Sequence, residues 1–379
     1  MQRKPFDAEM DMFRDAARKF FQQEIAPHSE AWRNAGIIDR EAYKKAGDAG
    51  LLCMWADEKY GGLGLSDFRY EQILIEENAA HGDVGYFITL HSRLVAPYIG
   101  NFGTEEQKAR ILPKCISGEW ILAIAMTEPD AGSDLAGMKA RAEDKGDHWL
   151  LNGSKTYISN GINADVVIVA AKTDPDNPHG MTLFLVERGM EGFERGRNLK
   201  KMGMKSNDTA ELFFKDVKVP KENVLGQVGA GFFHLMQGLA EERLIAAVGN
   251  LAGAQQAMKV TRDFVMQRKA FGKPLSKFQN TRFKLAELDA EMDTLQVYVD
   301  RCVEVHNEGK LNQMDASRAK LQTSELNGRM VDVGVQLHGG AGYMDEYPIC
   351  RMYQDERIHR ILAGSSEIMK EIIARGILD

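Results

Sequence analysis

Residues 241–258 read EERLIAAVGNLAGAQQAM, and every residue after the first three is uncharged. It opens with the charged cluster Glu241-Glu242-Arg243, and no charged residue follows from position 244 to position 258. A helix that is apolar on nearly all sides lies inside a protein and not on its surface. The run therefore predicts a central buried helix, with the charged cluster at the border of its buried part.

Two further apolar stripes follow on the C-terminal side of this run. Residues three and four apart share one face of a helix, so each stripe predicts an amphipathic helix. The stripes consist of Leu285, Leu288, Met292, Leu295 and Val299, and of Ala316, Ala319, Thr323, Leu326, Met330, Val333 and Leu337. Residues 231–379 are accordingly predicted to form a C-terminal helical bundle.

On the N-terminal side of the run, residues 121–230 change to short, β-branched segments. We expect strands at 149–151, 155–159, 166–171, 181–186 and 210–214. The dipeptide Asn152-Gly153 tolerates the positive φ of a tight turn, so it is predicted to join the first two strands as a hairpin. Residues 121–230 are therefore predicted to form a middle β domain.

Residues 1–120 return to a helical period. One apolar face is formed by Phe6, Met10, Phe13, Ala17, Phe20 and Phe21. Pro27 is expected to stop or kink this helix, and a further helix is expected at 68–78. The order is helices, a β domain, and helices again, which predicts an α+β protein whose two helical parts pack together.

Composition excludes several classes of protein. The 379 residues carry 48 Lys and Arg against 55 Asp and Glu, a net charge of −7, which argues against nucleic-acid binding. No apolar run reaches the roughly 18 to 20 residues that span a bilayer. Residues 1–6 hold no apolar signal region, which predicts a cytoplasmic protein. The four cysteines lie far apart without a CxxC pair, so neither a disulfide framework nor a zinc knuckle is expected.

Three short motifs are candidates for ligand contacts. Residues 127–134, TEPDAGSD, bring small residues and hydroxyls that would let backbone N–H groups approach a phosphate or a flat ring, although on pattern alone a polar connecting loop is the commoner explanation. Tyr157 and Ser159 lie two apart on a predicted strand and share one side of it, while a plain strand end remains the alternative. Residues 336–342, QLHGGAG, fit a helix C-terminus and lack the GxGxxG spacing.

The charged cluster supplies the candidate catalytic group. Such clusters are usually solvated, but this one borders a segment predicted to be buried. A carboxylate there would be partly desolvated, and its pKa would rise toward that of a useful general base. By contrast, His91, His338 and His359 have no metal-ligand spacing to one another, so no metal site is expected.

Five strings together resemble the acyl-CoA dehydrogenase family over essentially the whole chain. They are Met126-Thr127-Glu128-Pro129 with Ala131-Gly132-Ser133-Asp134, Tyr157-Ile158-Ser159-Asn160-Gly161, Arg268-Lys269-Ala270-Phe271-Gly272-Lys273, Gln336-Leu337-His338-Gly339-Gly340, and Gly364-Ser365-Ser366-Glu367-Ile368. The resemblance is greatest to the long-chain branch, through residues 208–214, DTAELFF, and 346–349, EYPI, with the isovaleryl branch next.

The resemblance implies an N-terminal helical domain, a middle β-barrel and a C-terminal four-helix bundle, assembled as a homotetramer around non-covalent FAD. Met126, Thr127, Ser133, Tyr157 and Ser159 match flavin and pyrophosphate contacts in the same subunit. Arg268, Phe271, Gln336, Gly339 and Gly340 match positions that hold the FAD of a neighbouring subunit, and Ser365 and Glu367 match the final adenosine-diphosphate contacts. Ser133, Asn207, Arg243 and Gly364 match positions at or beside the acyl-CoA channel, although many members carry Ser at the position of Asn207.

Two positions depart from the family pattern. Asp130 replaces the usual Gly of the flavin loop, which removes backbone freedom. Ala363 occupies the position where most members carry the catalytic Glu. The long-chain and isovaleryl branches share that loss and resemble this chain at Glu242, which makes Glu242 the expected base.

The resemblance implies α,β-dehydrogenation of a medium-to-long fatty acyl-CoA, the chemistry of fatty-acid β-oxidation. Electrons would pass to an electron-transferring flavoprotein. Four alternatives stay open at this stage: an isovaleryl-type or branched-chain dehydrogenase, an acyl-CoA oxidase, a flavin monooxygenase of the same fold, and a helical binding protein. The location would be the cytoplasm of a bacterium, or the mitochondrial matrix if the protein is eukaryotic and processed.

Overall fold

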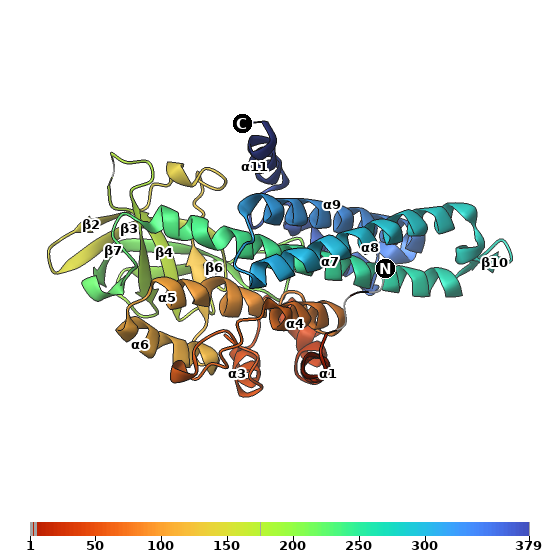
Figure 1. The fold of residues 1–379 in the computed structure, drawn as a ribbon, viewed down its shortest axis with the longest axis horizontal. Helices are drawn as coiled ribbons and strands as arrows, with labels where there is room; N and C mark the ends of the chain where they lie inside the picture. Colours follow the sequence, from red (N-terminus) through yellow and green to blue (C-terminus); the bar gives the residue numbers. More distant parts are fainter. Residues whose placement is uncertain (1–2, 4–5, 175, 379) are drawn as a thin grey trace.

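Helices, then strands, then helices again follow one another along the chain in the computed structural model, which describes residues 3, 6–174 and 176–378 (Figure 1). Most of residues 1–6, which carry the expectation of no signal region, lie outside this range. The described chain contains no helix that is both long and apolar enough to cross a membrane. The order of elements and the α+β class agree with the prediction.

The N-terminal helices are α1 (Ala8–Phe20), α2 (Ser29–Ala35), α3 (Arg40–Asp48), α4 (Phe68–His81), α5 (Ala96–Phe102) and α6 (Glu105–Ile116). Asp7 caps α1 by accepting a hydrogen bond from the backbone N–H of Met10, which satisfies one of the free donors at a helix start. Around Pro27 the α-helix gives way to a π-helical turn and a 3-10 turn. The expected interruption of the helix is therefore confirmed. Its physical reason is that proline lacks the N–H that would continue the helical hydrogen bonds.

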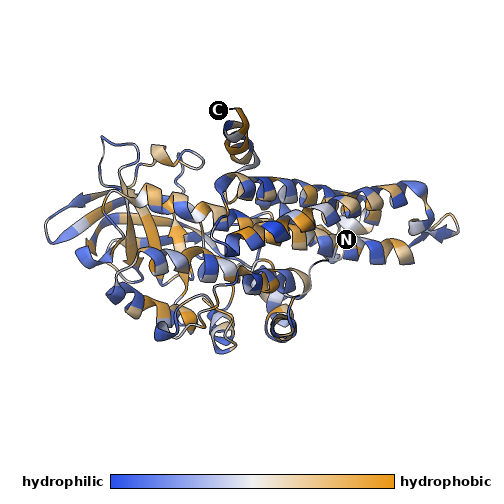
Figure 2. Cartoon of the chain, in the orientation of Figure 1, coloured by the Kyte–Doolittle hydropathy of each residue, from blue (hydrophilic) through white to orange (hydrophobic). Residues whose placement is uncertain are grey.

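Eight strands form the middle sheet: β1 (Leu122–Ala125), β2 (Arg141–Asp144), β3 (His148–Ser159), β4 (Val166–Lys172), β5 (Met181–Glu187), β6 (Phe193–Asn198), β7 (Thr209–Pro220) and β8 (Val224–Leu225). The order across the sheet is β6-β7-β3-β2-β4-β5-β8, and β1 pairs in parallel with β4. Strand β4 is buried along almost its whole length, so both of its faces are covered by other parts of the protein. Figure 2 shows hydrophobic residues along these strands.

The predicted hairpin at Asn152-Gly153 is wrong. Strand β3 runs without a turn through this dipeptide, and the pairing with β7 shifts register there as a bulge. Gly153 has a φ of 142°, and a Cβ would lie 2.7 Å from the Ala140 backbone, so glycine permits the bulge and the close approach. The true connection between β2 and β3 contains Gly146, whose φ is 92°.

The C-terminal elements are α7 (Gly231–Gln267), β9 (Lys269–Ala270), β10 (Lys273–Pro274), α8 (Gln279–Asn307), α9 (Gln313–His338), α10 (Pro348–Glu356) and α11 (Ser366–Leu378). Helix α7 contains the uncharged run and packs against α4, α8, α9 and α10. The predicted central helix is confirmed. At 1.5 Å per residue its 37 residues span about 55 Å, from the sheet to the far end of the bundle (Figure 1).

Candidate active site

Glu242 lies on α7, and its side chain is buried with 6 % of its surface exposed. The hydroxyl of Tyr98, from α5, donates a hydrogen bond of 2.8 Å to Glu242 Oε1. Burial raises the pKa of Glu242 to about 7, although the Tyr98 hydrogen bond and the Arg243 charge act in the opposite direction. A carboxyl group with a pKa near neutrality can accept and release a proton at physiological pH.

The neighbouring Glu241 is engaged elsewhere. Its carboxylate lies 2.7 Å from Arg93 Nε and 2.7 Å from His306 Nε2. Burial alone would raise the pKa of Glu241, but the hydrogen bond with His306 and the charge of Arg93 hold it below its ordinary value. Consecutive residues on a helix point about 100° apart, so Glu241 joins an ion-pair cluster while Glu242 faces Tyr98. The structure therefore separates two carboxylates that the sequence places side by side.

Arg243 connects the same turn of α7 to α9. Its Nη1 donates to Gln313 Oε1 and to Ser317 Oγ, the latter at 3.3 Å. Its Nε is buried and has no hydrogen-bond partner within the described residues. An unsatisfied buried donor is costly, so this N–H is available to a polar group of a bound ligand.

One turn further along α9, Lys320 holds the loop at positions 363 and 364. Its buried Nζ donates 2.7 Å to the carbonyl oxygen of Gly364. Ala363 has a φ of 54° and Gly364 a φ of 90°. The left-handed region costs a non-glycine residue roughly 1 kcal/mol or more, so the loop is kept in a strained conformation by contacts such as that of Lys320. Such strain is often found at functional sites.

The predicted flavin loop begins after β1 and folds back on itself through an isolated bridge between Glu128 and Ala131. Lys155 of β3 lies beneath it and is 1 % exposed. Its Nζ donates 2.9 Å to the Met126 carbonyl and 2.8 Å to Glu128 Oε1. Glu128 also accepts hydrogen bonds from the backbone of Lys139 and Ala140. This buried network fixes the loop on the sheet.

The side chains around the loop remain accessible. Ser133 and Tyr157 are exposed, and Met126, Thr127 and Ser159 are partly exposed. The Tyr157 ring is 69 % exposed and sits on a register shift of β3 with a φ of 59°. An exposed aromatic ring on strained backbone, with hydroxyls beside it, fits a flat ring system with polar edges.

A second group of predicted contacts lies at the opposite end of α7. Its members are Arg268, Phe271, Gln336, Gly339 and Gly340, and all are exposed. The Phe271 ring is 95 % exposed with a φ of 50°, and the positions where Cβ atoms of both glycines would stand have nothing within 4 Å. The rings of Phe264 and His338 stack at 4.0 Å and hold α7 and α9 together here.

Two predicted contacts begin α11. Ser365 Oγ accepts a hydrogen bond from the backbone N–H of Ile368, as an N-cap does, and Glu367 is exposed in the first turn. The remaining predicted channel residue, Asn207, is buried, and its amide donates 3.2 Å to Asn160 Oδ1.

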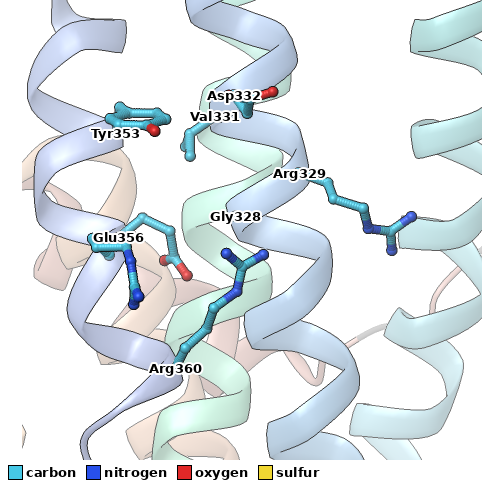
Figure 3. Close-up of a pocket in the computed structure, with 8 residues that line it drawn as sticks. Gly328, Arg329, Val331, Asp332, Tyr353, Glu356 and Arg360 are labelled. Atoms are coloured by element: carbon cyan, nitrogen blue, oxygen red, sulfur yellow. The ribbon is translucent and has the colours of Figure 1, made fainter. Parts of the chain in front are cut away.

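A separate pocket lies between α9 and α10 (Figure 3). Its lining is Gly328, Arg329, Val331, Asp332, Tyr353, Glu356, Arg357 and Arg360, none of which belongs to the predicted site. In Figure 3 the side chains of Glu356 and Arg360 point toward each other between the helices, while Arg329 points away. This pocket adds no group to the arrangement around Glu242.

Sequence reasoning missed Tyr98, Lys155 and Lys320. One signal was present, because Lys320 stands four residues after Ala316 and three before Thr323, on the apolar face of the stripe. A cation on such a face has to find a partner. Tyr98 and Lys155 carried no comparable signal, since each meets its partner only through the tertiary fold.

Comparison with known proteins assigns the class of the molecule. Family models described as the N-terminal, middle and C-terminal domains of acyl-CoA dehydrogenase match residues 7–119, 123–217 and 229–378. The chain belongs to the acyl-CoA dehydrogenase family. It is therefore an oxidoreductase, and its cofactor is FAD. The accessible rings, hydroxyls and open glycine positions described above fit that cofactor.

Within the family the chain is similar to long-chain members. It is 47 % identical over 379 residues to the long-chain specific acyl-CoA dehydrogenase, mitochondrial, of Mus musculus, covering 99 % of this chain and 88 % of that protein. It is 38 % identical over 374 residues to the isovaleryl-CoA dehydrogenase, mitochondrial, of Solanum tuberosum, covering 98 % and 90 %. An acyl-CoA dehydrogenase crystal structure from Geobacillus kaustophilus has a TM-score of 0.97 at 47 % identity, with complete coverage of both chains. The expected family and branch are confirmed.

Proposed function

We propose that the chain catalyses α,β-dehydrogenation of medium-to-long fatty acyl-CoA thioesters to trans-2-enoyl-CoA, with Glu242 as the base. The observation that carries the proposal is the buried Glu242 carboxyl, whose pKa burial raises to about 7, in a chain that has Ala363 where most members carry the base. The similarity to long-chain members supports the substrate class.

Bound FAD supplies the acceptor for the hydride that leaves the β-carbon. Glu242 accepts the α-proton as that hydride leaves, so the two hydrogens depart as a proton and a hydride. An α-proton of a thioester is a weak acid, and the developing charge on the carbonyl oxygen needs hydrogen-bond donors. The backbone N–H of Ala363 is our proposed donor from this chain, because Lys320 fixes the loop that carries it. Buried Arg243 supports the same region through α9.

The predicted cofactor contacts fall into two groups. Helix α7, about 55 Å long, runs from the sheet that carries the flavin loop to the turn that carries Phe271 (Figure 1). We infer that the Phe271 group contacts FAD held by a neighbouring copy, within a homotetramer. The proposal keeps the three predicted domains, with bounds 1–120, 121–230 and 231–379. It also includes an electron-transferring flavoprotein as the electron acceptor. The proposed location is the cytoplasm or the mitochondrial matrix.

An isovaleryl-type activity is the second candidate, favoured by the 38 % identity to an isovaleryl-CoA dehydrogenase. A series of straight and branched acyl-CoA thioesters, assayed with an artificial electron acceptor, separates the two. Highest kcat/KM for chains of eight or more carbons supports the first proposal, and highest kcat/KM for isovaleryl-CoA supports the second.

Replacement of Glu242 by Gln tests the role of the base. We expect E242Q to remain a folded, yellow flavoprotein with dehydrogenation slowed by a factor of roughly 10² to 10⁴. The matched control is E71Q, because Glu71 is equally buried and burial raises its pKa to about 7 as well. Near-normal turnover of E242Q would place the base elsewhere. Equal losses in both variants would indicate a general effect of removing a buried carboxyl group.

A further inference from the structure

The Tyr98 hydroxyl is the closest polar group to the proposed base that the reaction has not yet used. It lies on α5 and is 3 % exposed, and it reaches across to Glu242 on α7. Its only other contact of this kind among the described residues is a long one, 3.5 Å to the Leu235 carbonyl. The hydroxyl is therefore committed to the carboxyl group and not to the backbone.

The helix itself is shaped for this contact. Gly238 lies one turn before Glu242, and a Cβ at this position would stand 2.8 Å from the Tyr98 hydroxyl and 3.2 Å from Glu242 Oε1. Any side chain would have to displace the hydroxyl, the carboxyl group, or both. Glycine inside a helix costs about 1 kcal/mol relative to alanine, and here its absence of a side chain leaves room for the hydrogen bond.

We propose that Tyr98 is a positioning residue that orients the Glu242 carboxylate for removal of the α-proton. The inference rests on the proposed role of Glu242 as base. The hydroxyl takes one carboxylate oxygen, Oε1, which leaves Oε2 free to receive the proton. A single donor on one oxygen also stops rotation of the carboxyl group, and small errors of position at a reacting centre are expensive in rate.

The hydrogen bond has a second effect, on charge. A donor to the ionised carboxylate favours that form, so it opposes the rise in pKa that burial causes. Arg243 and Glu241 on α7 are the charged groups that act on Glu242 itself. Around them, Arg93 before α5 and His306 on α8 contact Glu241, Glu71 on α4 interacts with Arg93 and Glu241, and Lys320 on α9 interacts with Arg243. None of these contacts involves the Tyr98 hydroxyl.

The test compares pH profiles of kcat/KM for holoenzyme variants. Hydrogen bonds to charged groups correspond to about one to two pKa units. Y98F should therefore move the acidic limb of the profile upward by about one to two pH units, with a 10- to 100-fold loss of activity below that limb. G238A should move it in the same direction, although it retains both Tyr98 and Glu242.

The matched control is Y86F. Tyr86 is also a fully buried tyrosine, and its hydroxyl donates 3.0 Å to the carbonyl of Ala42, away from Glu242. Its profile should coincide with that of the wild type. A shift of Y86F equal to that of Y98F would overturn the proposal, and so would Y98F and G238A profiles that coincide with the wild type. If Y98F fails to fold, the G238A profile decides alone.

A spectroscopic readout separates this inference from the proposal on which it rests. The infrared absorption of a protonated carboxyl that is lost in E242Q reports Glu242 directly, without turnover. In Y98F that absorption should persist to a pH about one to two units higher than in the wild type. An unchanged midpoint overturns the role of Tyr98. Full turnover of E242Q overturns the role of Glu242 as base, whatever the infrared midpoint shows.

Discussion

Burial of the Glu242 carboxyl should reduce the stability of the folded protein at alkaline pH. Burial raises the pKa of Glu242 from 4.5 to about 7, a difference of about 2.5 units. Each unit corresponds to 1.36 kcal/mol of differential stabilisation. The ionised group therefore costs about 3 kcal/mol of folding free energy once the pH exceeds the folded pKa.

The sign follows from proton counting. Between pH 4.5 and 7 the folded state binds more protons at this site than the unfolded state, so its contribution to the unfolding free energy falls as pH rises. Below pH 4.5 both states are protonated and the cost vanishes. E242Q removes the titration. It should match the wild type near pH 4.5 and become more stable by up to about 3 kcal/mol near pH 8.

Urea unfolding of the two holoproteins from pH 5 to 8, at one fixed protein concentration, measures this difference. E241Q is the opposite control, because Arg93 and His306 hold the pKa of Glu241 below its ordinary value. Its removal leaves a buried cation unpaired, so E241Q should be less stable than the wild type at neutral pH. A stability difference for E242Q that stays constant over this range, or has the opposite sign at pH 8, would refute the reasoning.

Two further predictions concern the fold beneath the site. K155M should destabilise the protein by roughly 3 to 5 kcal/mol and weaken flavin retention, since Glu128 would stay buried without its 2.8 Å partner. Chemical unfolding measures the stability, and flavin absorbance after gel filtration measures the retention. A fully stable, yellow variant would contradict the assigned role of this pair. G118A should destabilise the folded protein more than G146A. Both glycines have positive φ, but only at Gly118 would a Cβ overlap the backbone of Tyr43. Equal unfolding midpoints of the two variants would show that the backbone at Tyr43 moves aside freely.

Local patterns in the sequence predicted most of the architecture. The uncharged run predicted the buried part of α7, and the later stripes predicted α8 and α9, because burial of one face imposes a helical period on the residues themselves. The strands at 166–171 and 181–186 were predicted from their short runs of apolar and β-branched residues. The failure at Asn152-Gly153 has a physical cause, since glycine at positive φ suits a bulge as well as a turn.

The candidate site also combines groups that the sequence predicts with contacts that only the tertiary structure creates. The place of the charged cluster 241–243 beside the uncharged run marked it as a candidate, and the motif around Thr127 was a candidate ligand contact. The resemblance to the acyl-CoA dehydrogenase family then singled out Glu242 and added the motif around Phe271. Only the tertiary structure separates Glu242 from Glu241, brings Tyr98 to its carboxyl group, and places Lys320 under the loop at Ala363. Periodicity depends on neighbours within one element, whereas these contacts join elements far apart along the chain, and their geometry exists only once the helices have packed.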